Sequence, residues 1–314
     1  MNIGNVVSAF DGYSSAQIAL NELGCNYDNY FASEICPHAI KVTQSNFKNT
    51  IQLGDITKID ASKLPKITLL CGGSPCQGFS FAGKKLNFND PRSKLFFEFV
   101  RLKNELTPQY FFLENVPMDI RSQNIISDFL ECEPIVINSK LVSAQDRVRL
   151  YWTNLPFTKP NNSNILLCDI VGFNSDIPYN LDEIRGEISK LTSREFDFSI
   201  SKNGRIRPYR LDNSKSGISE VGTIVNPYDK STTLIKSQVP KTYRSNPFEI
   251  YELNRNECEM LQNVPFGYTD AVSENKAKEM LGNGWTVGII KQFFMNLNSS
   301  PISRQRSMSL FAIG

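Results

Sequence analysis

The sequence predicts an α/β fold with a doubly wound, mostly parallel β-sheet and a second, smaller domain that is rich in loops. Short apolar segments alternate with helical segments over residues 5–113. Residues 66–71 and 110–113 are almost entirely apolar, as in parallel strands that are buried on both faces. Residues 157–250 are instead rich in Asn, Ser and Asp, with short apolar runs. Sheets of this type bind ligands at the carboxyl ends of their strands.

The expected elements follow one another in βαβ order. A strand at residues 5–10 leads through a Gly/Ser turn to a helical stretch at residues 16–23. A helix begins near Pro37, because proline suits the first turn of a helix. The remaining strands are expected at residues 30–33, 51–54, 66–71 and 110–113, and another helix at residues 93–106.

The change in character after residue 156 divides the chain. Helical patterns return at residues 255–261, 275–281 and 287–295. We therefore expect a first domain made of residues 1–156 and 251–303 and a second domain at residues 157–250. The last segment, residues 304–314, is expected to be a flexible tail.

Composition excludes several classes of protein. No run reaches the roughly 20 apolar residues of a membrane span, and from the apolar start without a basic segment we expect no signal peptide. The net charge is only +2, so a nucleic-acid surface would have to come from local clustering. The chain has seven cysteines without a CxxC pair and a single histidine. These numbers argue against a disulfide framework and a metal site, and they favour a reducing cytoplasm.

A turn directly after residues 66–71 carries the strongest local signal. It reads Gly-Gly-Ser-Pro-Cys-Gln-Gly-Phe-Ser and places Cys76 in a rigid, exposed position. Nearby backbone N–H groups or a cation would favour the thiolate of such a cysteine. The alternative is a tight turn with an incidental cysteine, since most free cysteines are small buried hydrophobic residues.

Two further polar signals accompany Cys76. Glu114 follows the apolar strand at residues 110–113, and it would lie beside Cys76 if the two strands are neighbours. The alternative is a glutamate that caps a helix or forms an ion pair, which is the commoner role of a glutamate at a strand end. Arg147 and Arg149 are separated by one residue, so on a strand they would project together and suit a phosphate or a carbonyl. The alternative for them is a solvated strand face.

Taken in this order, the turn cysteine, the glutamate and the QxRxR segment resemble the DNA cytosine-C5 methyltransferase family. The resemblance includes Phe10-Asp11-Gly12 after the first strand, although Tyr13-Ser14-Ser15 replaces the usual glycine-richer turn. It extends to NECEMLQNVP at residues 256–265 and LGNGWTV at residues 281–287. In detail the chain is similar to the branch of the animal de novo methyltransferases, and its length points to a bacterial or phage member.

The resemblance implies a Rossmann-like fold that binds S-adenosylmethionine, and it assigns the catalytic residues. Cys76 would attack C6 of cytosine, and Glu114 would protonate or hydrogen-bond N3. Arg149 would hold the O2 carbonyl, and Arg147 would support Glu114 or a flanking phosphate. The implied cofactor residues lie at the strand ends and near the C-terminus: Phe10, Asp11, Gly12, Glu34, Ile35, Asp55, Ile56, Ser74, Pro75, Asn283 and Trp285.

The implied substrate is a flipped-out cytosine in double-stranded DNA. Gln77, Phe79 and Ser80 would contact the DNA from a segment, residues 77–92, that could close as a lid. Residues 202–244 hold nine Lys/Arg against three acids, and Arg205, Arg207 and Arg210 are candidates for reading bases. A solvated charged face is the alternative for this cluster.

We expect a cytoplasmic monomer in a bacterial cell or a phage-infected host, and a cognate restriction nuclease is left open as a partner. Two rival functions are also considered. One is a tRNA cytosine-C5 methyltransferase, which the QGFS segment after Cys76 disfavours. The other is a catalytically dead DNA-binding regulator, which Cys76, Glu114 and Arg149 disfavour.

Overall fold

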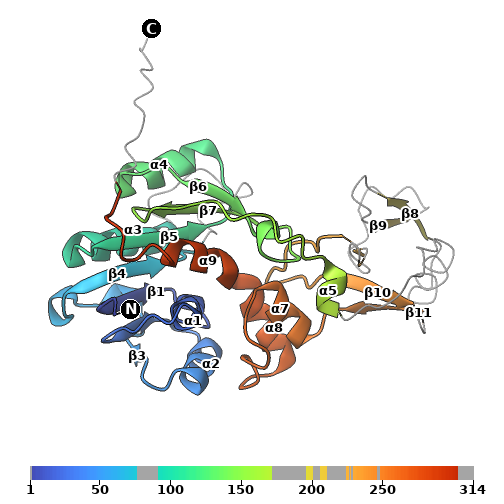
Figure 1. Cartoon of the computed structure of the whole chain (residues 1–314), viewed down its shortest axis with the longest axis horizontal. Helices are drawn as coiled ribbons and strands as arrows, with labels where there is room; N and C mark the ends of the chain where they lie inside the picture. The colour runs from blue at the N-terminus through green and yellow to red at the C-terminus, as the bar shows by residue number, and fades with distance from the viewer. Residues whose placement is uncertain are drawn as a thin grey trace, which may run out of the picture. The chain divides into compact units, whose positions relative to one another are not determined.

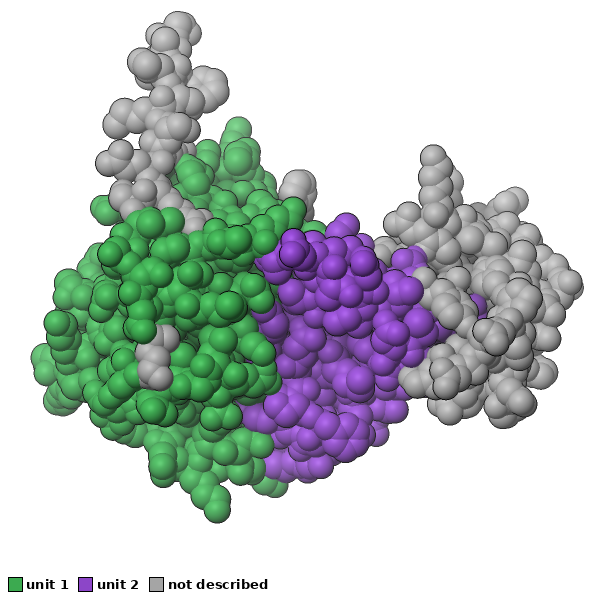
Figure 2. Space-filling view, in the orientation of Figure 1, with its two compact units in different colours: residues 1–138, 148–159, 289–314 green, residues 139–147, 160–288 purple. Residues whose placement is uncertain are grey.

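The computed structural model describes residues 2–75, 91–171, 196–200, 206–210, 224–225, 227, 229–245 and 248–302. The chain forms two compact units, which Figure 2 shows in green and purple. Unit 1 consists of residues 1–138, 148–159 and 289–314, and unit 2 consists of residues 139–147 and 160–288.

The described part of unit 1 is built on one sheet of seven strands in the order β3-β2-β1-β4-β5-β7-β6 (Figure 1). The strands are β1 (Asn5–Ala9), β2 (Tyr30–Ser33), β3 (Ile51–Gln52), β4 (Ile67–Gly72), β5 (Tyr110–Asn115), β6 (Ile135–Asn138) and β7 (Val148–Thr153). β1, β2, β3, β4 and β5 pair in parallel, and β7 runs antiparallel to both of its neighbours. The expected mostly parallel, doubly wound sheet is therefore confirmed.

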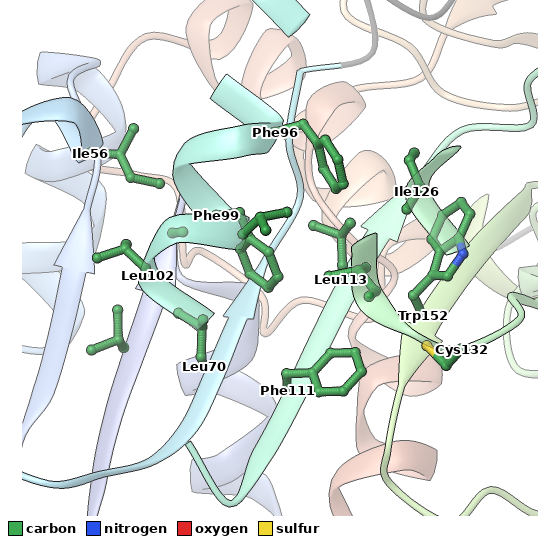
Figure 3. Packing of buried hydrophobic residues seen from close by; sticks show 14 of the residues in the cluster. Ile56, Leu70, Phe96, Phe99, Leu102, Phe111, Leu113, Ile126, Cys132 and Trp152 are labelled. Atoms are coloured by element: carbon green, nitrogen blue, oxygen red, sulfur yellow. The ribbon is translucent and has the colours of Figure 1, made fainter. Parts of the chain in front are cut away.

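One face of the sheet is covered by α3 (Pro91–Leu106) and α4 (Ile120–Leu130). Figure 3 shows Phe96, Phe99 and Leu102 of α3 among the side chains of this core. They pack with alternate residues of the strands, such as Leu70 on β4 and Leu113 on β5. This alternation is what a strand imposes, since successive side chains point to opposite faces.

The opposite face of the sheet packs on α9 (Val287–Phe294). Phe112 points to this face, because its neighbours Phe111 and Leu113 pack against α3 and α4 on the other face. The centroid of the Phe112 ring lies 5.1 Å from that of Phe293 and 5.6 Å from that of Phe294. Unit 1 also contains α1 (Ser15–Glu22), α2 (Pro37–Asn46) and the short 3₁₀ turns η1 (Ile56–Lys58) and η2 (Ala61–Lys63). The sheet is thus buried on both faces, which explains why its strands are apolar throughout.

Unit 2 combines helices with short antiparallel hairpins. Its elements include η4 (Ser139–Leu141), α5 (Leu167–Val171), α7 (Arg255–Leu261) and α8 (Glu274–Asn283), with the hairpins β8 (Phe196–Ile200)–β9 (Ile206–Arg210) and β10 (Lys241–Ser245)–β11 (Phe248–Glu252). Asn254 caps α7 with a capping box, because its side chain accepts from the Glu257 N–H while the Glu257 carboxylate accepts from the Asn254 N–H.

Several details differ from the sequence-based expectations. The third strand ends at Gln52 rather than at residue 54, because Asp55 starts η1. Residues 251–288 belong to unit 2, where α7 contacts both α5 and α8, whereas we expected them in the first domain. α4 and β6 form in segments whose sequence pattern predicted no helix or strand. Over the described residues, no helix combines the length and apolar character needed to cross a membrane.

Candidate active site

The functional residues of unit 1 gather at the carboxyl ends of neighbouring strands. β1 lies between β2 and β4, so the strand order reverses direction at β1 and β4. Ligands of doubly wound sheets bind outside such a switch point. Ala9 and Gly72, the last residues of these two strands, are register partners. A Cβ on Gly72 would lie 3.0 Å from the Ala9 carbonyl oxygen and 3.1 Å from the Phe99 ring, so the close approach favours glycine.

Glu34, directly after β2, is held by three backbone N–H groups. Its Oε1 accepts from Ile35 and Cys36, both at 2.8 Å, and its Oε2 accepts from Gly12 at 2.8 Å. A carboxylate offers about four acceptor positions, so a further donor can still bind. The arrangement fits a ribose hydroxyl, and it links the loop after β1 to the loop after β2.

Asp55 caps η1 at the end of the next strand. Its Oδ1 accepts from the backbone N–H of Thr57 at 3.0 Å and from the Thr57 hydroxyl at 2.9 Å. These bonds, the backbone bond first, hold the pKa of Asp55 below its ordinary value. Among the described residues, both hydrogen bonds to this carboxylate are made to Oδ1, which leaves Oδ2 to accept from a ligand amino group.

The two isoleucines of the predicted adenine site lie in different environments. Ile35 is 72% exposed, which suits an apolar contact with a ligand ring. Ile56 is only 3% exposed and packs in the core with Leu102 and Phe99. Phe10 also packs against that core and is partly buried. A contact between Ile56 and a cofactor therefore remains a prediction.

The loop after β1 turns Asp11 inward. Asp11 Oδ1 accepts from the Tyr30 hydroxyl at 2.8 Å, and Oδ2 accepts from the Ser14 hydroxyl. Burial raises the pKa of this carboxyl to about 6, against the opposing effect of these hydrogen bonds. Asp11 thus lies beneath the loop, where it supports the loop from inside the unit.

The turn after β4 is tied to the end of β5. The Asn115 amide donates to both the carbonyl oxygen and the hydroxyl of Ser74, at 3.3 and 3.2 Å, and both residues are buried. Pro75 is the last described residue before residue 91. Cys76, Gln77, Phe79 and Ser80 lie outside the described residues, so their roles remain predictions.

Glu114 and Arg149 form a buried ion pair at this end of the sheet. Arg149 Nε lies 3.1 Å from Glu114 Oε1, a distance typical of an ion pair, although the angle falls short of a hydrogen bond. The Arg149 Nη1 also donates to the carbonyl of Val148 at 2.7 Å. Glu114 immediately precedes Asn115, so the pair lies one residue from the side chain that holds the Ser74 turn.

Arg147 hydrogen-bonds to backbone carbonyls of unit 2. β7 begins at Val148, so Arg147 directly precedes the strand that carries Arg149. Its guanidinium donates to the carbonyl of Leu234 at 2.6 Å and to those of Gly282 and Gly284 at 3.2 and 2.9 Å. These bonds give Arg147 a structural function, and its catalytic role stays a prediction.

The remaining predicted residues also belong to unit 2. Trp285 is 9% exposed, and Asn283, the last residue of α8, is exposed. Arg207 and Arg210 lie in β9 of a two-stranded hairpin, and Arg205 lies outside the described residues. The expected alternation of Arg205 and Arg207 on one strand face and the reading of bases both remain predictions.

Sequence reasoning missed two residues that support the site. Arg101 on α3 donates to the carbonyl of Ile56 at 3.1 Å and to that of Ile59 at 3.2 Å, and so holds the turn that Asp55 begins. Tyr30 holds Asp11. No local sequence pattern predicts either contact, because Arg101 and Ile56 are 45 residues apart in the chain and Tyr30 and Asp11 are 19 residues apart.

Comparison with known proteins decides the family. The model of the C-5 cytosine-specific DNA methylases matches residues 4–299. This chain belongs to the C-5 cytosine-specific DNA methylase family. Its activity is therefore the transfer of a methyl group from S-adenosylmethionine to C5 of cytosine in DNA. The resemblance inferred from the ordered motifs is confirmed at the level of the family.

Curated relatives come from bacteria and phages. The type II methyltransferase M.DsaV of Dactylococcopsis salina is 28% identical over 307 residues, which cover 91% of this chain and 83% of that protein. The orphan methyltransferase M.Rho11sI of Bacillus phage rho11s is 35% identical over 159 residues, which cover 46% of this chain and 32% of the phage protein.

Solved structures share the fold. The methyltransferase EhMeth of Entamoeba histolytica superposes with a TM-score of 0.67 at 17% identity, over 93% of this chain and 97% of that chain. A putative DNA modification methyltransferase encoded within an Escherichia coli prophage gives a TM-score of 0.64 at 20% identity, over 94% of this chain and 99% of that chain. The predicted Rossmann-like methyltransferase fold is thus confirmed.

Proposed function

We propose that this DNA (cytosine-5-) methyltransferase acts on a flipped-out cytosine in double-stranded DNA, with Cys76 as the nucleophile. The observation that carries the proposal is the buried Glu114–Arg149 pair at the end of β5. Asn115, the next residue, holds the Ser74 turn, and Cys76 follows that turn by two residues. A carboxyl, a guanidinium and a thiol are the groups that this reaction requires around one pyrimidine ring.

The chemistry assigns one task to each group. The Cys76 thiolate adds to C6, and the ring electrons move to C5, which becomes nucleophilic. Glu114 shares a proton with N3, and Arg149 donates to O2, so that both groups stabilise the charge that develops during the attack. S-adenosylmethionine supplies the electrophilic methyl group when it is bound. Loss of the C5 proton to a base then allows elimination of the Cys76 thiolate.

The residues at the ends of β2 and β3 fit the cofactor. Glu34 retains acceptor capacity for a ribose hydroxyl, and Asp55 Oδ2 remains for the adenine amino group. Ile35 offers an exposed apolar surface to the adenine ring. Ser74 and Pro75 would approach the cofactor from the turn after β4, and Asn283 and Trp285 would complete its site.

Recognition of DNA is assigned to two segments. Gln77, Phe79 and Ser80 would contact the DNA around the extruded cytosine, and Arg205, Arg207 and Arg210 would contact phosphates or bases. Support comes from the excess of positive charge over residues 202–244 and from the β8–β9 hairpin that carries two of these arginines.

The biological setting is also part of the proposal. Type II and phage methyltransferases among the relatives support a cytoplasmic enzyme in a bacterium or in a phage-infected host. A cognate restriction nuclease would be the partner in the first setting, and protection of phage DNA would be the role in the second. We expect the enzyme to act as a monomer.

A covalent trapping experiment tests the proposed function. A duplex containing 5-fluorocytosine has no removable proton at C5, so the wild-type enzyme and S-adenosylmethionine should give a stable protein–DNA adduct. Cys76→Ala should give no adduct and no methyl transfer, with cofactor binding within about threefold of wild type. An adduct with Cys76→Ala, or transfer to tRNA in preference to the duplex, would refute the proposal.

A further inference from the structure

Unit 1 contains a buried acid whose carboxylate takes no part in the methyl-transfer steps described above. Asp11 is 8% exposed and lies in the loop directly after β1. Its two carboxylate oxygens accept from different elements, Oδ1 from Tyr30 on β2 and Oδ2 from Ser14 at the start of α1. Ser14 is the N-cap of α1, but its side chain makes no capping bond and donates to Asp11 instead.

The backbone of this loop is conformationally demanding. Phe10, Gly12 and Ser14 all have positive φ, at 56°, 58° and 63°. Two of these three residues are not glycine, and such conformations cost free energy unless surrounding contacts enforce them. The residues after Gly12 are Tyr13-Ser14-Ser15, none of which is glycine. The hydrogen bonds to Asp11 therefore supply a restraint that this loop needs.

The same loop holds a residue of the cofactor site. The Asp11 N–H donates to the Ser33 carbonyl at 3.0 Å, and the Gly12 N–H donates to Glu34 Oε2 at 2.8 Å. A loop with a different backbone conformation would withdraw the Gly12 N–H from Glu34. Glu34 would then lose one of the three donors that fix its carboxylate for a ribose hydroxyl.

We propose that Tyr30, Asp11 and Ser14 are positioning residues of the cofactor site, in which the ionised Asp11 carboxylate holds loop 10–14 and thereby keeps Gly12 against Glu34. This inference rests on the proposed cofactor site. An ionised carboxylate accepts from Tyr30 and Ser14 at the same time. A neutral carboxyl carries a proton on one oxygen, which must then donate, so the hydroxyl that faces it has to turn its own hydrogen away and accept, and the loop loses one of its two bonds to a charged carboxylate.

Asp11 is the member of this cluster that titrates in mildly acidic solution. Burial raises its pKa to about 6, and the charge of Glu34 acts in the same direction. The other titratable groups that face it are Tyr30 on β2 and Cys71 on β4. Burial raises the pKa of Tyr30 well above its ordinary value and that of Cys71 to about 12, so both stay neutral.

The test is calorimetric titration of S-adenosylmethionine into the full chain, without DNA, between pH 5 and pH 7. Wild-type affinity should fall about tenfold per pH unit below the pKa of Asp11. Tyr30→Phe removes a hydrogen bond to the charged form and should move the midpoint up by about one pH unit. Ser14→Ala should act in the same direction, and Asp11→Asn should bind more weakly with no pH dependence in this range.

Tyr27→Phe is the matched control. Its ring centroid lies 5.7 Å from that of Tyr30, and its hydroxyl accepts from Gln17 rather than contacting Asp11. It should reproduce the wild-type profile. Circular dichroism verifies folding, and Ser14→Ala provides the second variant if Tyr30→Phe does not fold. If the affinity of wild type, Tyr30→Phe and Ser14→Ala depended on pH in the same way, the positioning role would be refuted and the proposed cofactor site would stand. Absence of binding by the wild type at every pH would instead refute the cofactor site.

Discussion

Arg149 and Glu114 face each other across the antiparallel strands β7 and β5, with Nε 3.1 Å from Oε1 and with both side chains only 10% exposed. Burial of two charges costs several kcal/mol of solvation each, which their attraction only partly offsets. The pair is therefore poorly explained as a device for stability. A catalytic role explains the same geometry, because Glu114 could bind N3 and Arg149 could bind O2 of a cytosine in place of part of their contact with each other.

Glu114→Gln should abolish most of the methyl transfer while leaving cofactor binding intact. Glutamine has the same shape but cannot share a proton with N3, so kcat should fall about 10²- to 10⁴-fold, the range for loss of a general acid. Affinity for S-adenosylmethionine should stay within about threefold. Single-turnover transfer of labelled methyl groups to duplex DNA gives the first quantity, and calorimetry gives the second.

Glu22→Gln is the matched control for this prediction. Glu22 forms an ion pair with Lys291 at 2.8 Å within the same unit, but both side chains are 33% exposed. Its neutralisation should leave kcat unchanged, because exposed pairs contribute little. A Glu114→Gln enzyme within tenfold of the wild-type rate would remove Glu114 from the mechanism.

Arg147→Lys should destabilise unit 2. The arginine donates to three carbonyl oxygens, those of Leu234, Gly282 and Gly284, and a lysine cannot span them with a rigid fork. Loss of two such buried bonds should cost about 2–4 kcal/mol. Hydrogen exchange of the amides of residues 231–236 measures the local loss, and the exposed substitution Arg121→Lys should cost less than about 0.5 kcal/mol. A loss of kcat with unchanged protection would favour the catalytic role instead.

Gly282→Ala should disturb the same region through packing. A Cβ at this position would lie 2.4 Å from the Ile235 carbonyl carbon and 2.5 Å from the Lys236 nitrogen, and both are backbone atoms that cannot rotate away. The expected loss is about 1–3 kcal/mol, although alanine favours the helix. Asn275→Ala, on the exposed surface of the same helix, should be neutral or slightly stabilising. Equal urea midpoints for the two variants would show that the 235–236 segment moves freely.

Local signals in the sequence predicted which residues lie at the strand ends, but not what they contact. Glu34, Asp55 and Glu114 each follow or end an apolar strand, and the period of a strand and the topology of a parallel sheet bring such residues to one edge. Ser74 was likewise predictable, because it sits in the turn after β4.

Contacts between distant segments were not predictable. The spacing of Arg147 and Arg149 suggested one strand face, yet β7 begins between them and Arg147 bonds to carbonyls 87 and 135 residues away. Residues 251–288 show helical periodicity, but this pattern does not indicate in which unit the apolar faces of the helices are buried. The Tyr30–Asp11 bond joins two positions that each look like ordinary core and loop residues. Such contacts depend on tertiary packing, which one sequence does not encode in any local pattern.

The pH dependence of stability offers a test of the buried Asp11 that is independent of cofactor binding. Burial raises the pKa of this carboxyl from 3.8 to about 6, so the folded state binds its proton more tightly than the unfolded state. The stabilisation from the neutral form is complete below the unfolded pKa and is lost as pH rises through about 6. The difference between these two pKa values corresponds to about 3 kcal/mol. The ionised state that we assign to the working enzyme is therefore the less stable one.

Asp11→Asn remains neutral, so its stability relative to wild type should rise by up to about 3 kcal/mol between pH 4 and pH 7.5. Urea unfolding across this range measures the difference. Asp119→Asn is a control of opposite sign: hydrogen bonds, first from the Ser122 hydroxyl, hold the pKa of Asp119 below its ordinary value. The ionised Asp119 therefore stabilises the folded state above the pKa of the unfolded state, and this stabilisation is lost as pH falls. Asparagine caps α4 equally well, so the capping bond itself is retained in the variant. If Asp11→Asn showed no pH-dependent gain while Asp119→Asn behaved as expected, the Asp11 carboxyl would be hydrated in solution and could not hold loop 10–14 as proposed.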